Sequence, residues 1–297
     1  MIAQLVVDGV LTGAVIALGA IGVTLGLAIL RFANFGYAEF MTVGGYATLT
    51  AVMAYGGTGA PLGPFSFGGF MIAALALGLV VTAAVAIAGD VAVFRPLRRR
   101  GAGSLVLIFA SFGLALIVRS VVLLIYGTQP EYYSREIQIA LLLPGDVRVM
   151  PDQILVLGIT AVALAVLWWL LRRTRVGLAM RAVAENPALA QASAIDPESA
   201  VRWTWLVTGA LGALAGTLYG LTVQLRPEIG ANLLLPLFTA AVLGGVGSVP
   251  GAVVGGLLVG VAENLSVLVL PTSYKAIVPF VIMLACFLVR PKGLFGK

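Results

Sequence analysis

The sequence predicts an all-α protein that crosses a membrane several times as a polytopic helix bundle. Of its 297 residues, 61% are hydrophobic and only 10% are charged, and the mean hydropathy is +1.09. Soluble domains carry about 45–50% apolar and about 25% charged residues. The 18 basic and 12 acidic residues are too few to cover the surface of a water-soluble globule. Most of the chain is therefore expected to lie in lipid.

The apolar runs predict eight or nine membrane segments, because a helix needs about 20 mostly apolar residues to cross a bilayer. The clear candidates are residues 5–30, 35–55, 70–94, 104–126, 154–171, 203–223 and 276–289. The stretch 233–270 is too long for one span and is interrupted by glycines and a proline at 244–251, so we expect a broken or re-entrant pair there. Short connections elsewhere predict a single transmembrane domain over 1–297, with an external loop at 127–152 and a cytoplasmic loop at 172–202.

The distribution of Lys and Arg predicts the orientation. Thirteen basic residues lie on one side, near 31, 95–100, 172–202 and 290–297, and four lie on the other. The four are Arg135, Arg148, Arg226 and Lys275. Since cytoplasmic loops carry the excess of basic residues, the richer side is predicted to be cytoplasmic, with the amino terminus outside. The first apolar stretch has neither a basic segment before it nor an A-x-A cleavage site, so we expect a retained first helix.

Composition also excludes several kinds of catalytic site. The chain has no histidine, which excludes Ser-His-Asp catalysis and histidine-ligated metal sites. Its only cysteine, Cys286, cannot form an internal disulfide or a CxxC pair. No G-x-x-x-x-G-K-[ST] loop is present, so the chain is not expected to bind nucleotide phosphates. We predict no metal or cofactor in this chain, and we ascribe its pI of about 9.8 to topology rather than to nucleic acid.

The inner loop 172–202 predicts two short helices. Its Ala-rich part, 176–184, favours a helix. Asn186 followed by Pro187 has the pattern of an N-cap and a first helical residue, which predicts a second helix from 187 to about 193. Such a pair offers a small knob for the groove of a partner protein. A solvated, basic inner loop with no further role fits the same residues, and both interpretations stay open here.

Three stretches resemble a known family. The first is the spacing Gly177-x-Ala179-x-Arg181-Ala182-x-Ala184-x-Asn186 with Ile195-Asp196 after it, which is similar to the coupling loop of ABC importer permeases. The second, residues 31–40 (RFANFGYAEF), resembles the "NFA-x-GE" segment of permeases for branched-chain amino acids. The third, residues 238–251 (FTAAVLGGVGSVPG), matches the "FTAAVLGG-x-GS-x-PGA" segment of the same family, and the ending PKGLFG also fits. Departures from the pattern are Gly36, Ala38 and Ala194.

The resemblance, to the shorter of the family's two permease types, implies an ATP-driven importer. It implies a second homologous permease that completes the path, two cytoplasmic ATPase subunits that bind ATP and Mg²⁺, and a periplasmic or extracellular substrate-binding protein. It also implies a location in the bacterial or archaeal inner membrane. The residues that it assigns to ATPase coupling are Gly177, Ala179, Arg181, Ala182, Glu185, Asn186, Pro187, Ile195 and Asp196.

Two breaks in the apolar pattern are candidates for the translocation path or its gate. One contains Gly244, Gly245, Gly247, Ser248 and Pro250. Broken backbone at membrane depth is tolerated only when it is buried in protein or faces a water-filled cavity, where helix ends can meet a zwitterion. The alternative is a tight helix crossing.

The other break follows the first span and is flanked by Asn34 and Glu39. Glu39 fits the stabilisation of a helix start by the helix dipole at least as well as it fits path lining.

Three further charged residues lie in or near the spans. Arg119 is inside a span, where an isolated charge is costly, so we expect an ion pair or a subunit contact. Asp90 is expected to pair at the surface with Arg95 or Arg98. Glu263 either lines the path or pairs internally.

Two other classes of protein remain as rivals. A stand-alone channel or ion-coupled carrier, for instance for urea or small amides, would have ionisable residues deep in several spans, whereas only Arg119 is central here. An integral membrane enzyme would need catalytic groups, and the chain has neither histidine nor paired central carboxylates.

Overall fold

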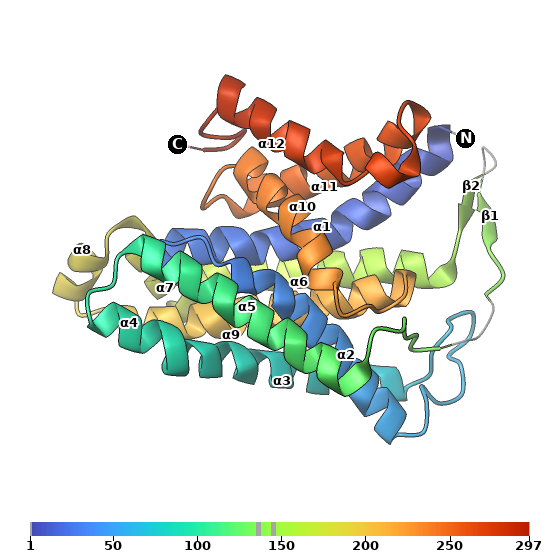
Figure 1. Cartoon of the computed structure of the whole chain (residues 1–297), viewed down its shortest axis with the longest axis horizontal. Helices are drawn as coiled ribbons and strands as arrows, with labels where there is room; N and C mark the ends of the chain where they lie inside the picture. Colours follow the sequence, from blue (N-terminus) through green and yellow to red (C-terminus); the bar gives the residue numbers. More distant parts are fainter. Residues whose placement is uncertain (1, 135–137, 144–146, 297) are drawn as a thin grey trace.

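The computed structural model describes residues 2–134, 138–143 and 147–296 and is built almost entirely of helices (Figure 1). Arg135, Glu136 and Asp146 of the predicted external loop lie outside the described residues, as does Lys297. The predicted all-α class is confirmed, with one small addition. A hairpin of two three-residue strands, β1 (Leu141–Leu143) and β2 (Val147–Val149), pairs antiparallel within the external loop.

The longer helices agree with the apolar runs. They are α1 (Ile2–Leu30), α2 (Glu39–Ala54), α3 (Phe70–Gly89), α5 (Ser104–Tyr126), α6 (Pro151–Arg173), α9 (Pro197–Thr222), α10 (Ile229–Gly244), α11 (Val249–Leu265) and α12 (Ile277–Val289). The short elements are η1 (Phe35–Ala38), the π-helical turn η2 (Asp90–Phe94), α4 (Arg95–Arg99), α7 (Arg175–Glu185), α8 (Pro187–Ala192), η3 (Ser266–Leu268) and η4 (Thr272–Tyr274). α9 begins earlier than hydropathy indicates because the Asp196 carboxylate accepts hydrogen bonds from the backbone N–H groups of Glu198 and Ser199.

α1 forms the centre of the bundle and packs against α9, α10 and α11. Its closest approach is to α11, where small residues face one another. A Cβ on Gly13 would lie 2.9 Å from the Gly256 carbonyl oxygen, and one on Gly260 would lie 2.4 Å from the Gly13 Cα. Small residues at such crossings let helix backbones approach closely in membranes. Any larger side chain at this crossing would push α1 and α11 apart.

Six described helical segments are long and apolar enough to cross a membrane. They begin at Ile2, Phe70, Ser104, Pro151, Pro197 and Val249, and α10 and α12 are shorter apolar helices. The segment from α1 is 89% buried, whereas those of α5 and α6 are 17% and 22% buried. α5 and α6 therefore present apolar faces to lipid or to another subunit. The protein is a multi-pass membrane protein, and the count of eight or nine segments stays a prediction.

The bundle has two chemically different ends (Figure 1). At one end lie α4, α7 and α8, with many of the chain's arginines. At the other lie the amino terminus and the β1–β2 hairpin. The hairpin is tied to α1 because Gln4 exchanges two hydrogen bonds with the backbone of Arg148. The arrangement agrees with the predicted segregation of basic residues to one side.

Candidate transport and coupling sites

The inner loop folds as the sequence predicts. α7 and α8 meet at Asn186, whose Oδ1 accepts hydrogen bonds from the N–H groups of Ala188 (3.0 Å) and Leu189 (3.1 Å). Asn186 is thus the N-cap of α8, and Pro187 is its first helical residue. We call α7, α8 and the connection to α9 (residues 175–196) the coupling corner.

α7 is held close to the bundle by its buried side. Thr174 caps the helix through a hydrogen bond from the Gly177 N–H, and a Cβ on Gly177 would lie 2.3 Å from the Leu170 carbonyl oxygen of α6. Met180 and Val183 are buried in the main apolar core. Arg181 and Glu185 are exposed, whereas Ala179 and Ala182 are half-buried. The corner is therefore a firmly seated projection whose outer side carries polar side chains and exposed leucines.

A shallow groove runs between α7 and α8 on the outer side of the corner. Its volume is about 220 Å³. It is lined by Ala182, Glu185, Asn186, Leu189, Ala190, Ser193 and Ile195. Leu189 is 66% exposed beside it, and Asp196 at the end of the corner is also exposed. Four of the nine predicted coupling residues, Ala182, Glu185, Asn186 and Ile195, line this groove, whereas Gly177 is buried.

Arg31 connects the coupling corner to the first break. It directly follows α1, has the left-handed backbone angle φ +58°, and its Nη2 donates to the carbonyl oxygens of Ala184 (3.5 Å) and Glu185 (3.4 Å). These carbonyls belong to the last turn of α7, where backbone acceptors lack helical partners. This contact was not predicted, because nothing in the local sequence around Arg31 indicates which helix end its side chain reaches.

The break after α1 places Glu39 at the start of α2. Its buried carboxylate forms an ion pair with the partly exposed Arg119 of α5, with 3.0 Å between Arg119 Nη2 and Glu39 Oε1. Its second oxygen accepts a hydrogen bond from Thr42, whose hydroxyl in turn accepts from the Gly230 N–H at the start of α10. The ion pair expected for Arg119 is confirmed. Glu39 also occupies the helix start expected from the dipole argument.

Asn34 lies on the other side of η1 and is 8% exposed. Among the described residues, no donor reaches its Oδ1, and the buried Tyr37 hydroxyl also lacks a hydrogen-bond partner there. The two side chains line a cavity of about 10 Å³ with Gly22, Gly26 and Thr208. That volume is close to the minimum for one water molecule. The path-lining role predicted for Asn34 and Glu39 stays a prediction.

The glycine–proline break is a turn between α10 and α11 rather than an opening deep in the bundle. A Cβ on Gly247 would lie 3.7 Å from the Cβ of Ala28, in the last turn of α1, and the Gly247 N–H donates to the Thr24 hydroxyl. Ser248 caps α11 by accepting from the Gly251 N–H. A Cβ on Gly244 would lie 2.2 Å from the Gly251 carbonyl oxygen. These contacts place the turn near the end of α1, and its depth in the membrane stays a prediction.

The carboxyl-terminal tail completes this turn. The N–H groups of Leu294 and Phe295 donate to the carbonyl oxygens of Leu243 (2.7 Å) and Gly244 (3.1 Å), which end α10. Gly245 has φ +98°, and a Cβ there would lie 2.5 Å from the Gly296 nitrogen. The two family-like segments, 238–251 and the tail, therefore form one structural unit. A gating role for Gly245, Gly247, Ser248 and Pro250 stays a prediction, whereas close packing accounts for Gly244.

The pairing expected for Asp90 with Arg98 is confirmed, but its expected location at the surface is wrong. Asp90 is buried in the π-helical turn η2 and binds Arg98 at 2.7 Å. Arg95 pairs instead with Glu198 at the start of α9 (3.3 Å). The unusual turn rotates Asp90 inward, which helical spacing alone does not reveal. Glu263 is buried in α11.

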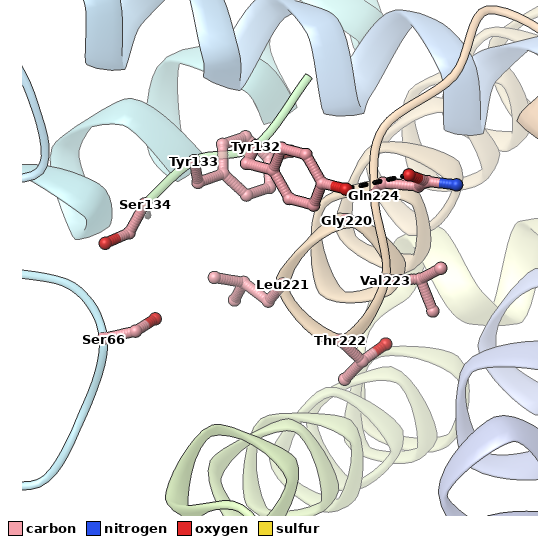
Figure 2. Close-up of a pocket in the computed structure, with 9 residues that line it drawn as sticks. All are labelled: Ser66, Tyr132, Tyr133, Ser134, Gly220, Leu221, Thr222, Val223 and Gln224. Carbon is pink, nitrogen blue, oxygen red and sulfur yellow. Dashed lines mark hydrogen bonds between the residues drawn. The ribbon is translucent and has the colours of Figure 1, made fainter. Parts of the chain in front are cut away.

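At the opposite end of the bundle, a pocket opens beside the end of α9 (Figure 2). Its volume is about 340 Å³, and it is lined by Ser66, Tyr132, Tyr133, Ser134 and residues 220–224. A hydrogen bond of 2.9 Å joins the Tyr132 hydroxyl to the Gln224 side chain. The buried Tyr133 hydroxyl donates to the Gly45 carbonyl oxygen, and burial raises the pKa of this phenol. The external loop was predicted but the pocket was not, since the pocket residues are far apart in the chain.

Comparison with known proteins agrees with this arrangement. The family model described as branched-chain amino acid transport system, permease component, matches residues 5–287. The chain is 32% identical to the high-affinity branched-chain amino acid transport system permease protein BraD of Pseudomonas aeruginosa, covering 99% of this chain and 95% of that protein. It is 30% identical to LivH of Escherichia coli K12, with coverage of 99% and 95%. It is 27% identical to a probable LivH of Methanocaldococcus jannaschii, with coverage of 97% and 92%.

No solved structure matches this chain. The family match, the near full-length relatives and the bundle of membrane-spanning helices lead to the same conclusion. The chain belongs to the family of permease components of branched-chain amino acid transport systems.

Proposed function

We propose that this chain is a permease subunit of an ATP-binding cassette importer in the bacterial or archaeal inner membrane. Its substrates are branched-chain or similar apolar amino acids. The observation that carries the proposal is the similarity, over nearly the whole chain, to permease proteins named for branched-chain amino acid transport. The coupling corner, which packs firmly on the bundle and projects from its basic end, supports the proposal.

The chain works with partners and performs no catalysis of its own. A second homologous permease completes the path, and two cytoplasmic ATPase subunits bind ATP and Mg²⁺ and dock on the coupling corner. A substrate-binding protein delivers the amino acid to the opposite end. The lack of a phosphate-binding glycine loop in the sequence supports this division of labour, because the energy then comes from another subunit.

Arg31 connects the coupling corner to the inside of the bundle, so that movement of the corner is transmitted to the segment 31–38. The Arg31 side chain holds the end of α7, and its backbone leads within three residues to Asn34 and then to Glu39. Closure of the ATPases on the corner therefore displaces the segment 31–38 and biases an equilibrium between inward-open and outward-open states. A ligand or partner shifts such an equilibrium only by binding the two states differently.

Uptake into proteoliposomes tests the proposed function. The chain is reconstituted with its second permease, its ATPases and its binding protein, and uptake of radiolabelled leucine, isoleucine, valine and urea is measured with and without ATP on the ATPase side. We expect ATP-dependent uptake of the three amino acids and none of urea. The same chain reconstituted alone is expected to move none of them.

Two outcomes would contradict the proposal. ATP-independent flux through the chain alone, at the rate of the full complex, would identify a channel or carrier. ATP-driven uptake of urea or a short amide without uptake of amino acids would support an importer but contradict the proposed substrate class.

A further inference from the structure

One side of α6 is packed against the bundle and the other side is uncovered. The helix runs from the β1–β2 hairpin to α7 (Figure 1). Beyond its first turn, the buried residues share one face, and they are Val156, Thr160, Leu167 and Leu171. Val162, Val166 and Trp169 lie on the other side, and each is more than half exposed. α6 thus presents a continuous apolar face outside the bundle.

This exposed face ends in arginine. Arg173 shares the face of Val166 and Trp169, because an α-helix has about 3.6 residues per turn, and it is itself exposed. Arg172 is exposed as well, and its guanidinium carbon lies 5.1 Å from the centroid of the Trp168 ring. Such a cation–π contact holds the charge at the ring. We call Trp168, Trp169, Arg172 and Arg173 the α6 patch.

Among the described residues, neither arginine of the α6 patch has an acidic partner or a hydrogen-bond acceptor. The ion pairs at the basic end of the bundle join other side chains, namely Arg95 with Glu198, Arg98 with Asp90, and Arg202 with Asp196. The dipole of α6 favours basic residues in its last turn, but this effect does not engage their N–H groups. Two guanidinium groups with unused donors therefore stand at the end of the exposed face.

The depth of the patch in the membrane follows from its residue types. α6 is long and apolar enough to cross a membrane, and its apolar run ends directly before Arg172. Tryptophan is enriched at the membrane–water interface, at the level of the lipid headgroups. Trp168 and Trp169 are both exposed at this point. The two arginines therefore lie at headgroup level, and Val162 and Val166 lie at the level of the acyl chains.

We propose that the α6 patch binds an anionic phospholipid, with the phosphate on Arg172 and Arg173 and an acyl chain along the exposed face of α6. Guanidinium groups bind phosphate oxygens through paired N–H donors. The apolar face continues from the arginines, so one lipid molecule matches both the charge and the apolar surface. Since only Thr174 separates α6 from α7, the bound lipid fixes the base of the coupling corner at the membrane surface. The inference does not depend on the proposed function.

Lipid titration of the purified full chain, followed by native mass spectrometry, tests the site. The probes are dioleoyl phosphatidylglycerol, which is anionic, and dioleoyl phosphatidylcholine, which is zwitterionic. The wild type is expected to bind the first phosphatidylglycerol about tenfold more tightly than phosphatidylcholine. The double variant Arg172→Gln, Arg173→Gln is expected to lose about tenfold in affinity for phosphatidylglycerol. Arg175, which belongs to the coupling corner, is left unchanged.

The matched control removes the same charge from the same end of the bundle. Arg99 and Arg100 of the α4 region are exposed and, in the described part of the chain, their side chains form no ion pair. The double variant Arg99→Gln, Arg100→Gln is expected to lose less than about twofold in affinity for phosphatidylglycerol. Both variants change exposed side chains, so their thermal unfolding in detergent is expected to match that of the wild type.

A second pair of variants tests the tryptophan and keeps every charge. Trp168→Leu removes the ring that holds Arg172 and is expected to weaken phosphatidylglycerol binding about threefold. Trp203→Leu removes an exposed tryptophan of α9 and is expected to leave the affinity unchanged.

Three outcomes would overturn the inference. The first is equal affinity of the wild type for the two lipids. The second is an equal loss of phosphatidylglycerol binding in the two arginine double variants, which would indicate attraction to the basic end as a whole. The third comes from the same titration of the complete complex. If the difference between the two double variants disappears there, another subunit covers the patch. A failed uptake assay would contradict the proposed function and leave these results as they stand.

Discussion

At the scale of single residues, the ion pair of Glu39 and Arg119 joins α2 to α5 inside the bundle. The Glu39 side chain is 3% exposed, and its two oxygens are engaged by Arg119 and Thr42. Since charges are costly in a membrane, each member of the pair depends on the other. The network also reaches the first turn of α10 through Gly230, so three helices share it.

Removal of one partner is expected to cost more than removal of both charges. Arg119→Leu leaves an unpaired buried carboxylate and is expected to lower the free energy of unfolding by about 3–5 kcal/mol. The double variant Glu39→Gln, Arg119→Leu is expected to recover most of that loss. The measurement is the rate of maleimide labelling of Cys286, the chain's one cysteine, which is buried and becomes reactive on unfolding. Equal labelling rates for the single and double variants would show that the pair does not hold the fold.

Residues differ in how far the sequence predicts them. Asn186 and Arg119 were predicted because their local requirements are strict: a helix start needs a cap, and a charge in an apolar span needs a partner. The burial of Asp90 was not predicted, because a π-helical turn changes which side a residue faces. Two other features depend on tertiary packing and could not be predicted from a single sequence. They are the unpartnered oxygen of Asn34 and the contact of Arg31 with the end of α7.

At the scale of elements, the turn between α10 and α11 and the tail act as one unit. Gly245 combines a left-handed φ with a close approach to the tail, and the tail in turn bonds to the last carbonyls of α10. The sequence predicted the break from its glycines and left open whether it is a gate or a tight helix crossing. The sequence does not show which residues contact the break. In the structure these residues come from α1 and from the carboxyl-terminal tail.

Substitution of Gly245 is therefore expected to act on stability. Gly245→Ala adds a Cβ where both φ and space are unfavourable, and we expect it to destabilise the protein by more than about 1 kcal/mol. Gly113→Ala is the matched control, because Gly113 lies in α5 with no atom within 4 Å of an added Cβ. Thermal unfolding of the two variants in detergent measures the difference. A Gly245→Ala protein with wild-type stability and blocked uptake would instead support the gate.

At the scale of the whole molecule, hydropathy was sufficient to predict the class and most of the helices. The 104–126 run coincides with α5, and the interrupted 233–270 run became two helices. Helix packing was not predictable to the same degree. α1 is central and α5 peripheral although both are strongly apolar, because burial here depends on the small residues that let α1 meet α11.

In the proposed function, the ATPases dock at one end of the molecule and the substrate-binding protein delivers the amino acid at the other. The coupling corner, Arg31 and the segment 31–39 form a continuous connection from the basic end into the bundle. The pocket beside the end of α9 lies at the opposite end of the bundle. Signals between the two ends therefore have to cross the length of the helices.

The most direct measurement is substrate-stimulated ATP hydrolysis by the complete complex in liposomes, with the coupling corner altered. Glu185, Asn186 and Pro187 are replaced together by alanine, which removes the cap of α8 and the exposed corner between the two helices. Asn186→Asp, which keeps an oxygen cap, is the control. The account predicts that the triple variant loses stimulation by substrate while its bundle stays folded, and that the control retains it. Full stimulation of ATP hydrolysis by substrate in the triple variant would contradict this role of the coupling corner, because the ATPases would then be coupled to the path through another surface.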